Sequence, residues 1–276
     1  MWKISENLYL AQLPMIEGPT RKEEFEKNHI KRVLTVMTEP IPMMRRLQDV
    51  DYKFIHVFDM PNEPILENGV LQEALRYIED AVEHEENVVV HCLAAVSRSV
   101  SMCVGYQMWK NQWSLEKALK MVQSIRKAAS PNAGFLAQLK IWEKCGLDFS
   151  PERYKNLRVT VPGVSDADAK YLWRQPVIDD KTKIRFKCRS CRKLLFTSDN
   201  IVHSVKENCP YVVEPMEWLL LTGRQCSLSH SCGAKLGNFF SQGSRCQVCS
   251  KFVRLWIDVD KSKVDKVLPT PIVESS

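Results

Sequence analysis

The sequence lacks the features that mark several broad classes of protein. None of its apolar runs approaches the roughly 18 to 20 residues that a membrane-spanning helix needs. It contains no internal repeat and no low-complexity tract. With 45% hydrophobic and 26% charged residues, the composition also argues against a disordered chain, a collagen-like fibre and a coiled-coil rod. We therefore expect a globular protein that does not enter a membrane.

The N-terminus also lacks the apolar stretch of a secretory signal peptide, because Lys3, Glu6 and Asn7 interrupt it. We expect the protein to stay in the cytoplasm and nucleus, where structural disulfides are rare. The ten cysteines must then mostly serve other purposes.

Cysteine and charge are distributed unevenly along the chain. Three cysteines precede residue 150 and seven follow it, and the formal net charge is −2 for residues 1–150 and +8 for the remainder. This asymmetry predicts two domains with different partners. We assign the first to residues 1–150 and the second to residues 184–276, with a proline-bearing linker at 151–183.

In the first domain, short apolar runs alternate with helical patterns. The strand-like runs are 33–36, 52–57 and 88–90, and the helical patterns are 71–82, 115–125 and about 135–144. Ser114 stands where the second of these helices needs its N-cap. Strands that alternate with helices predict an α/β domain.

The most informative segment is an apolar strand that leads into a cysteine, five residues and an arginine. Cys92 and Arg98 enclose Leu93, Ala94, Ala95, Val96 and Ser97, and a helical run follows. A loop between a strand and a helix N-terminus can direct backbone N–H groups and the helix dipole at a phosphate. Arg98 would grip two phosphate oxygens, and the same field would favour the thiolate of Cys92. The segment predicts nucleophilic attack on phosphorus and a phosphocysteine intermediate.

Two further residues complete the predicted chemistry. Asp59, 33 residues before Cys92, follows a strand-like run and could protonate the leaving oxygen, then activate water. The hydroxyl of Ser99 could donate a hydrogen bond to the departing sulfur. We expect His91 to orient the loop, and Cys103 to be a core residue.

These residues, with the segments 8–11 and 131–135, closely resemble the dual-specificity protein phosphatases over about residues 1–145. The resemblance implies a cysteine-phosphatase-like fold with a mostly parallel sheet flanked by helices. It also implies a shallow pocket for phosphotyrosine and phosphoserine or phosphothreonine in a phosphoprotein, and catalysis without metal. By the same match, Cys92 is the nucleophile, Arg98 the phosphate clamp, Asp59 the acid and Ser99 the assistant.

The chain departs from that family at one position of the loop. The family usually has glycine where this chain has Ala95, and a Cβ there could restrict φ or distort the phosphate-binding loop. An alanine there could lower the activity, although the residues that carry the chemistry are all present.

The C-terminal domain carries nine residues that are suited to binding metal. They are Cys188, Cys191, His203, Cys209, Cys226, His230, Cys232, Cys246 and Cys249. Two CxxC pairs separated by a long insert are typical of zinc. Two tetrahedral sites need eight ligands, and the choice between Cys226 and His230 stays open. Because closed sites of four ligands are structural, we expect two zinc ions that stabilise this small domain.

After the first CxxC pair, the segments 214–218 and 232–239 resemble the tail of the zinc-bearing type 12 dual-specificity phosphatases. This resemblance implies association with the maturing large ribosomal subunit, in nucleus and cytoplasm. A basic cluster could also contact an RNA backbone, or could be a solvated face. Its members are Lys181, Lys183, Arg185, Lys187, Arg189, Arg192 and Lys193.

Two functions follow from these observations. The first is a protein phosphatase whose zinc domain targets it to maturing large ribosomal subunits. The alternative is a ribosome-assembly or interaction protein in which the phosphatase domain is weakly active or only binds phosphopeptides.

Overall fold

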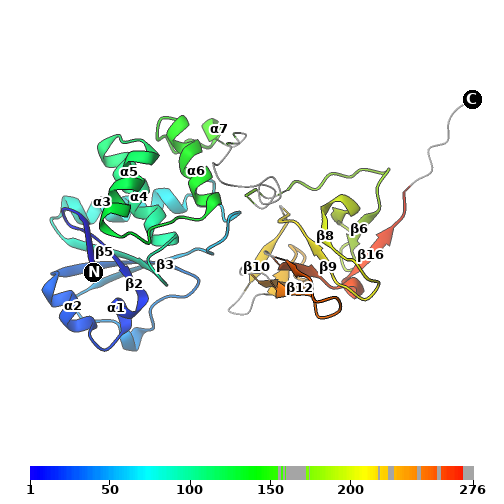
Figure 1. Ribbon diagram of the computed structural model, residues 1–276, viewed down its shortest axis with the longest axis horizontal. Coiled ribbons are helices and arrows are strands. Elements are labelled where there is room, and N and C mark those ends of the chain that lie inside the picture. Colours follow the sequence, from blue (N-terminus) through cyan, green and yellow to red (C-terminus); the bar gives the residue numbers. More distant parts are fainter. Residues whose placement is uncertain are drawn as a thin grey trace, which may run out of the picture. The chain divides into compact units, whose positions relative to one another are not determined.

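The computed structural model contains two compact units, Met1–Val164 and Ser165–Ser276 (Figure 1). It describes residues 1–154, 157, 159, 172–173, 175–216, 218–222, 227–240, 244–253 and 256–269. The division between the units falls inside the segment 151–183 that the sequence suggests as a linker. In the described part of the chain, no helix combines the length and the apolar character needed to cross a membrane.

The first unit is a five-stranded sheet flanked by helices. Its strands are β1 (Trp2–Ser5), β2 (Leu8–Gln12), β3 (Ile30–Met37), β4 (Asp51–His56) and β5 (Asn87–Cys92). Its helices are α1 (Leu13–Glu17), α2 (Arg21–Lys27), α3 (Val70–Glu83), α4 (Arg98–Asn111), α5 (Leu115–Ile125), α6 (Ala133–Lys144) and α7 (Pro151–Tyr154), with a 3-10 turn η1 (Met43–Arg45). Figure 1 shows α1 and α2 on one side of the sheet and α3 to α6 on the other.

The strand order is β1-β2-β5-β3-β4. The four strands β2, β5, β3 and β4 are parallel, and only β1 runs antiparallel, against β2. The expected mostly parallel sheet is therefore confirmed. β5 is central, and Val88, Val89 and Val90 are fully buried because helices cover both faces of the sheet. The carboxyl ends of the four parallel strands lie along the same edge of the sheet. Cys92 is at the centre of that edge, because it ends the central strand β5.

Polar caps begin two of the helices. The Ser114 Oγ accepts the Lys117 N–H at 3.3 Å where α5 begins, and the Asn132 Oδ1 accepts the Phe135 N–H at 2.9 Å where α6 begins. Each side chain satisfies a backbone donor that the first helical turn leaves open.

α4 has no exposed face over most of its length, because its residues from Arg98 to Met108 are all buried. It contacts β5, α3, α5 and α6. A helix surrounded in this way is held firmly by the core, so Arg98 has a well-defined place beside the end of β5.

The second unit is built from short strands. They are β6 (Arg185–Cys188), β7 (Leu194–Thr197), β8 (Ile201–His203), β9 (Tyr211–Val213), β10 (Leu220–Thr222), β11 (Ser227–Ser229), β12 (Lys235–Phe240), β13 (Ser244–Arg245), β14 (Phe252–Val253), β15 (Trp256–Val259) and β16 (Val264–Val267), with 3-10 turns η2 (Ser198–Asn200) and η3 (Lys261–Lys263). They form sheets of six (β10-β11-β12-β15-β9-β8), three (β16-β6-β7) and two (β13-β14) strands.

Apolar packing in this unit is more extensive than the sequence suggests. The rings of Phe186 and Phe196 stack with centroids 4.7 Å apart, and Phe239 and Ile257 are almost completely buried. The prediction of a domain stabilised largely by metal therefore understates the contribution of its apolar core.

The two ends of the expected linker pack on different units. The Tyr154 hydroxyl in α7 donates to the Leu66 carbonyl in the first unit at 3.4 Å. In the second unit, the Gln175 N–H donates to the Pro215 carbonyl at 2.7 Å. Residues near both ends of the segment 151–183 thus make tertiary contacts.

Candidate active site and metal clusters

The loop between β5 and α4 holds Cys92 at its start and Arg98 at its end. The Cys92 side chain is buried, with 2% of the residue exposed, and the Ser99 hydroxyl donates a hydrogen bond to its sulfur at 3.1 Å. The structure thus brings together the cysteine and the serine that the sequence suggests for one chemical step.

Neighbouring segments bind the carbonyl groups of this loop from outside. The Leu13 N–H donates to the Leu93 carbonyl at 3.1 Å, and the Ser130 N–H donates to the Val96 carbonyl at 2.8 Å. The Arg126 guanidinium donates to the two carbonyls between them, at 3.3 and 3.5 Å. In a trans peptide the N–H points opposite to the C=O, so the N–H groups of this loop are directed away from these outer partners. This arrangement suits a cradle for an anion.

Ala95 adopts a φ of 51°, in the left-handed region of the backbone. This conformation costs an alanine more than a glycine, which gives a physical reason for a glycine at this position. The alanine is fully buried, so the loop accommodates its methyl group without opening.

The Asp59 carboxylate lies across the loop and faces three groups. Its Oδ1 accepts hydrogen bonds from the Ser97 hydroxyl at 2.6 Å and from the Asn132 amide at 2.9 Å. Its Oδ2 lies 3.6 Å from the Arg98 Nε. Asn132 precedes the last helix that the sequence predicts, but no local pattern predicts its contact with a residue 73 positions away.

Arg98 is 8% exposed and its guanidinium is only lightly bonded within the protein. One long hydrogen bond reaches the Val57 carbonyl at 3.5 Å, and its buried Nε makes no hydrogen bond with the described residues. A buried cation with spare donors favours an anion beside it. The guanidinium is therefore available to two phosphate oxygens.

His91 is fully buried behind the loop. Its Nε2 lies 2.8 Å from the Thr35 Oγ1 and its Nδ1 lies 3.4 Å from the Cys92 carbonyl oxygen. Burial lowers the pKa of His91 to about 4, so the ring is neutral near pH 7 and holds the loop by hydrogen bonds. Cys103, in α4, is also fully buried, and burial raises the pKa of its thiol, as expected of a core cysteine.

Fold and site together are those of a protein phosphatase. The family model described as the dual specificity phosphatase catalytic domain matches residues 8–145. The chain belongs to the dual specificity phosphatase family, and its similarity to relatives across both units shows that it is of the dual specificity protein phosphatase 12 type.

Three relatives illustrate this similarity. Dual specificity protein phosphatase 12 of Rattus norvegicus is 27% identical over 99% of this chain and 90% of its own length. Tyrosine-protein phosphatase yvh1 of Schizosaccharomyces pombe is 28% identical over 96% of this chain and 84% of its own. Dual specificity protein phosphatase MPK-4 of Drosophila melanogaster is 30% identical over 78% of this chain, which spans only 58% of that relative.

The second unit contains two clusters of four cysteine and histidine side chains. In each cluster the ligand atoms lie within 4.8 Å of one another. The first cluster is Cys188, Cys191, His230 and Cys232, and the second is His203, Cys209, Cys246 and Cys249. Of the two residues left open by the sequence, His230 lies in the first cluster, and Cys226 lies outside the described residues.

The separations within the clusters fit a tetrahedral zinc ion. Zn–S distances of about 2.3 Å and Zn–N distances of about 2.0 Å imply edges of about 3.8 Å between sulfurs and about 3.5 Å between sulfur and nitrogen. In the first cluster, Cys188 and Cys232 Sγ are 3.9 Å apart, and the His230 Nδ1 lies 3.3 Å from the Cys232 Sγ and 3.5 Å from the Cys191 Sγ. The residues present therefore fit a metal ion of this size.

The second cluster has similar dimensions. The Cys209 and Cys246 sulfurs are 3.6 Å apart, and the Cys249 Sγ lies 3.5 Å from the His203 Nε2. This cluster joins β8 to the β13–β14 hairpin, whereas the first joins the β6–β7 turn to the β11–β12 turn. A metal in each would fasten segments far apart in the sequence.

Most of the predicted basic cluster is paired with carboxylates. Four of its seven members have partners: Lys183 with Asp199, Arg185 with Asp179, and both Arg189 and Arg192 with Asp265. These pairs reduce the positive field that a phosphate backbone would meet. The structure therefore favours the solvated-face interpretation for this stretch.

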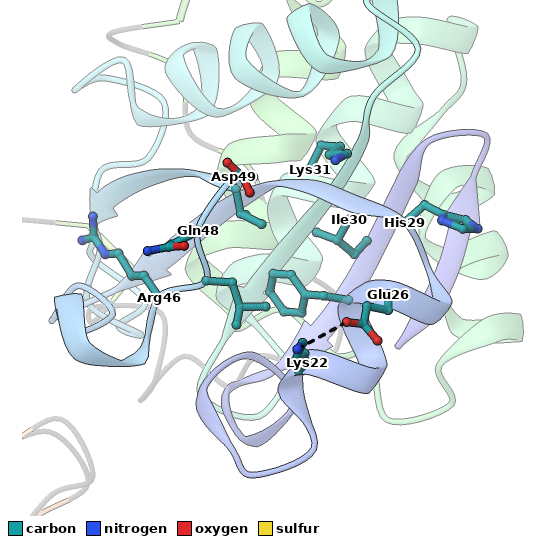
Figure 2. Close-up of a pocket in the computed structure, with 11 residues that line it drawn as sticks. Lys22, Glu26, His29, Ile30, Lys31, Arg46, Gln48 and Asp49 are labelled. Atoms are coloured by element: carbon teal, nitrogen blue, oxygen red, sulfur yellow. Dashed lines mark ion pairs between the residues drawn. The ribbon is translucent and has the colours of Figure 1, made fainter.

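A hollow of about 830 Å³ lies between α2, the start of β3 and the segment before β4 (Figure 2). Figure 2 shows Lys22 and Glu26 facing each other at its rim, where they form an ion pair of 3.9 Å. The hollow is at the amino ends of β3 and β4, whereas Cys92 ends the parallel strand β5. It is separate from the candidate active site.

Proposed function

We propose that this protein hydrolyses phosphotyrosine and phosphoserine or phosphothreonine in proteins through a phosphocysteine. The Cys92 thiolate attacks phosphorus, an S–P bond forms, and the P–O bond to the substrate breaks. The leaving oxygen takes a proton from Asp59. Arg98 and the backbone N–H groups of the loop hold the phosphoryl oxygens throughout.

Water completes the cycle. Asp59, now a carboxylate, removes a proton from the water that attacks phosphorus, and the S–P bond breaks to release phosphate. The Ser99 hydroxyl stabilises the returning thiolate through its hydrogen bond. The observation that carries this proposal is the buried Cys92 sulfur, which accepts a hydrogen bond from Ser99 at 3.1 Å in the loop that begins α4 with Arg98.

The decisive variant is Cys92→Ser, compared with Cys145→Ser as a matched control. Cys145 lies at the end of α6, where its thiol donates to the Arg153 carbonyl at 3.2 Å. Cys92→Ser should abolish hydrolysis of an aryl phosphate and the acid-stable phosphoenzyme formed by rapid quenching, and Cys145→Ser should retain both. Full turnover by Cys92→Ser would refute the mechanism.

We further propose that the second unit binds two structural zinc ions, one in each cluster. Each closed set of three sulfurs and one nitrogen leaves no coordination position for substrate. Elemental analysis of the purified chain should find two zinc ions, and phosphatase activity should need no added metal. One ion or none in the folded protein would defeat this assignment.

We propose that the zinc unit targets the phosphatase to maturing large ribosomal subunits in the nucleus and cytoplasm. Support comes from the similarity to type 12 phosphatases across both units and from the basic charge of the C-terminal part. Of the basic cluster, Lys181, Lys187 and Lys193 have no ion pair with the described residues, and these three could contact an RNA backbone.

Sedimentation of the tagged protein with ribosomal particles tests this targeting. Association should survive Cys92→Ser and fail when Cys188 and Cys191 are both replaced by serine. If the zinc-unit variant still co-sediments while truncation of the phosphatase unit abolishes association, the targeting role belongs to the phosphatase unit.

A second function is favoured by the backbone at Ala95. Its positive φ is consistent with a loop whose activity is reduced, as in an assembly protein that mainly binds phosphopeptides. A Cys92→Ser protein that supports ribosome assembly as well as the wild type would favour this alternative.

A further inference from the structure

The first turns of α6 contact the segment that follows Asp59 at successive points. A Cβ on Gly134 would lie 1.5 Å from the Pro61 carbonyl oxygen, so the helix backbone packs directly on that segment. One turn further, the Gln138 side chain reaches Glu63 and Leu66. Residues 59–66 contain turns but no helix or strand, so α6 supplies support that regular backbone pairing does not.

Gln138 uses both ends of its amide in this contact. Its Nε2 donates to the Glu63 carbonyl at 2.7 Å and to the Gly134 carbonyl at 3.3 Å. Its Oε1 accepts the Leu66 N–H at 3.1 Å. The side chain is buried, with 6% of the residue exposed. Removing the amide would leave the Leu66 N–H without a partner and would leave the Glu63 carbonyl only the Ile65 N–H at 3.0 Å, so the segment would have to shift to recover the lost bonds.

The same helix also holds the carboxylate itself. Asn132, the N-cap of α6, donates to the Asp59 Oδ1 at 2.9 Å. Helix α6 thus contacts both the backbone that follows Asp59 and the side chain of Asp59. We propose that Gln138 is a positioning residue that keeps Asp59 within reach of the leaving-group oxygen. This inference rests on the proposed function, in which Asp59 donates the proton.

The test compares substrates that differ in their need for an acid. The full chain is assayed on 4-nitrophenyl phosphate, whose leaving group is stable without a proton, and on phenyl phosphate, whose leaving group is not. Gln138→Met keeps the volume and removes the hydrogen bonds. Its kcat/KM should fall about 10-fold on phenyl phosphate and less than about 3-fold on 4-nitrophenyl phosphate, because misplacement costs only the step that uses the acid.

Gln107→Met is the matched control. Gln107 is 3% exposed in α4, and its amide donates to the Ser5 hydroxyl at 2.9 Å, on the β1 side of the sheet and away from Asp59. Its replacement should leave the ratio of the two substrates unchanged. An equal change of ratio in Gln107→Met would mean that loss of any buried amide produces the effect, and would overturn the proposal.

Combining Gln138→Met with Asp59→Asn separates the acid role of Asp59 from the positioning role of Gln138. If Asp59→Asn alone shows no dependence on the leaving group, the proposed acid fails, whatever Gln138 does. If Asp59→Asn shows the dependence, Gln138→Met should add no further loss on phenyl phosphate in that background. A further 10-fold loss there, or an equal loss on both substrates in the single variant, would overturn the positioning role.

Gln138→Glu provides a second test in case Gln138→Met does not fold. It keeps an acceptor for the Leu66 N–H and loses the donor to the Glu63 carbonyl, so its ratio of substrates should lie between those of the wild type and Asp59→Asn. An unchanged ratio in folded Gln138→Glu, together with unfolded Gln138→Met, would count against the proposal.

Discussion

Replacing His230 by alanine should remove one zinc ion from the second unit, whereas Cys226→Ser should remove none. His230 is 4% exposed, and its Nδ1 lies 3.3 Å from the Cys232 Sγ and 3.5 Å from the Cys191 Sγ. With Cys188 these residues already supply four ligands, which is the full number for a structural zinc site. A fifth ligand from position 226 is not needed.

The size of the effect follows from the number of ligands. A structural zinc ion contributes about 10–16 kcal/mol of apparent binding free energy, so one of four ligands accounts for about 3–4 kcal/mol. This loss corresponds to a zinc affinity about 100- to 1,000-fold weaker. Because a domain of this size is stable by only about 5–15 kcal/mol, His230→Ala should also lower its unfolding midpoint.

The assay is elemental analysis after dialysis against a chelator that the wild-type protein resists. The expected zinc content is two ions for the wild type and Cys226→Ser, and one for His230→Ala. The second cluster is the internal control, since its ligands include neither changed residue. Two ions in His230→Ala together with one in Cys226→Ser would show that the ligand set is wrong.

Three further predictions concern the phosphatase unit. Ala95→Gly should change the free energy of unfolding by less than about 1 kcal/mol, because relief of the positive φ is offset by lost methyl burial and by the greater chain entropy of glycine. Its kcat should rise several-fold, and an unchanged kcat would remove the loop strain as a cause of low activity. Asn132→Ala should cost about 1 kcal/mol of stability through the lost helix cap and should slow hydrolysis of phenyl phosphate more than that of 4-nitrophenyl phosphate. An equal fold-loss on the two substrates would contradict the role of its contact with Asp59. For His91, the folded pKa of about 4 lies below the unfolded value of about 6.5, so its contribution to stability is complete above pH 6.5 and is lost as the pH falls through 4. Urea unfolding at pH 7 and pH 5 measures this contribution. The free energy of unfolding should fall by about 2 kcal/mol more in the wild type than in His91→Asn when the pH is lowered from 7 to 5. An equal fall in the two proteins would contradict this.

The pattern of strands and helices in the first unit was largely predictable. The runs at 33–36, 52–57 and 88–90 lie in or overlap β3, β4 and β5. Residues 33–36 and 88–90 are apolar or buried because helices cover both faces of these inner strands, whereas β4 is a partly exposed edge strand. The strands β1 and β2, formed by residues 2–12, were not predicted as strands. β1 is a short edge strand of mixed burial, which weakens its pattern. β2 lies beside the central β5 and its residues 8–11 are buried, so its apolar run is a signal that the prediction missed.

The charged and metal-binding residues of the second unit were predictable in kind but not in pairing. The sequence shows nine suitable metal ligands, and no spacing rule chooses between His230 and Cys226 at the first cluster. It also shows a run of seven basic residues, but not that Arg192 meets Asp265, 73 positions away. Both outcomes depend on how antiparallel strands bring distant turns together.

By itself, the sequence determined the candidate phosphate-binding segment, because Cys92, the loop and Arg98 are contiguous and a strand followed by a helix directs them at one point. Only the tertiary structure decided what surrounds Asp59. Parallel strands end at a common edge, and this topology brings Asp59, Ser97 and Asn132 into contact from three separate segments. The support that Gln138 gives to residues 63–66 is of the same kind, since it joins a helix and a loop that are about 70 positions apart in the sequence.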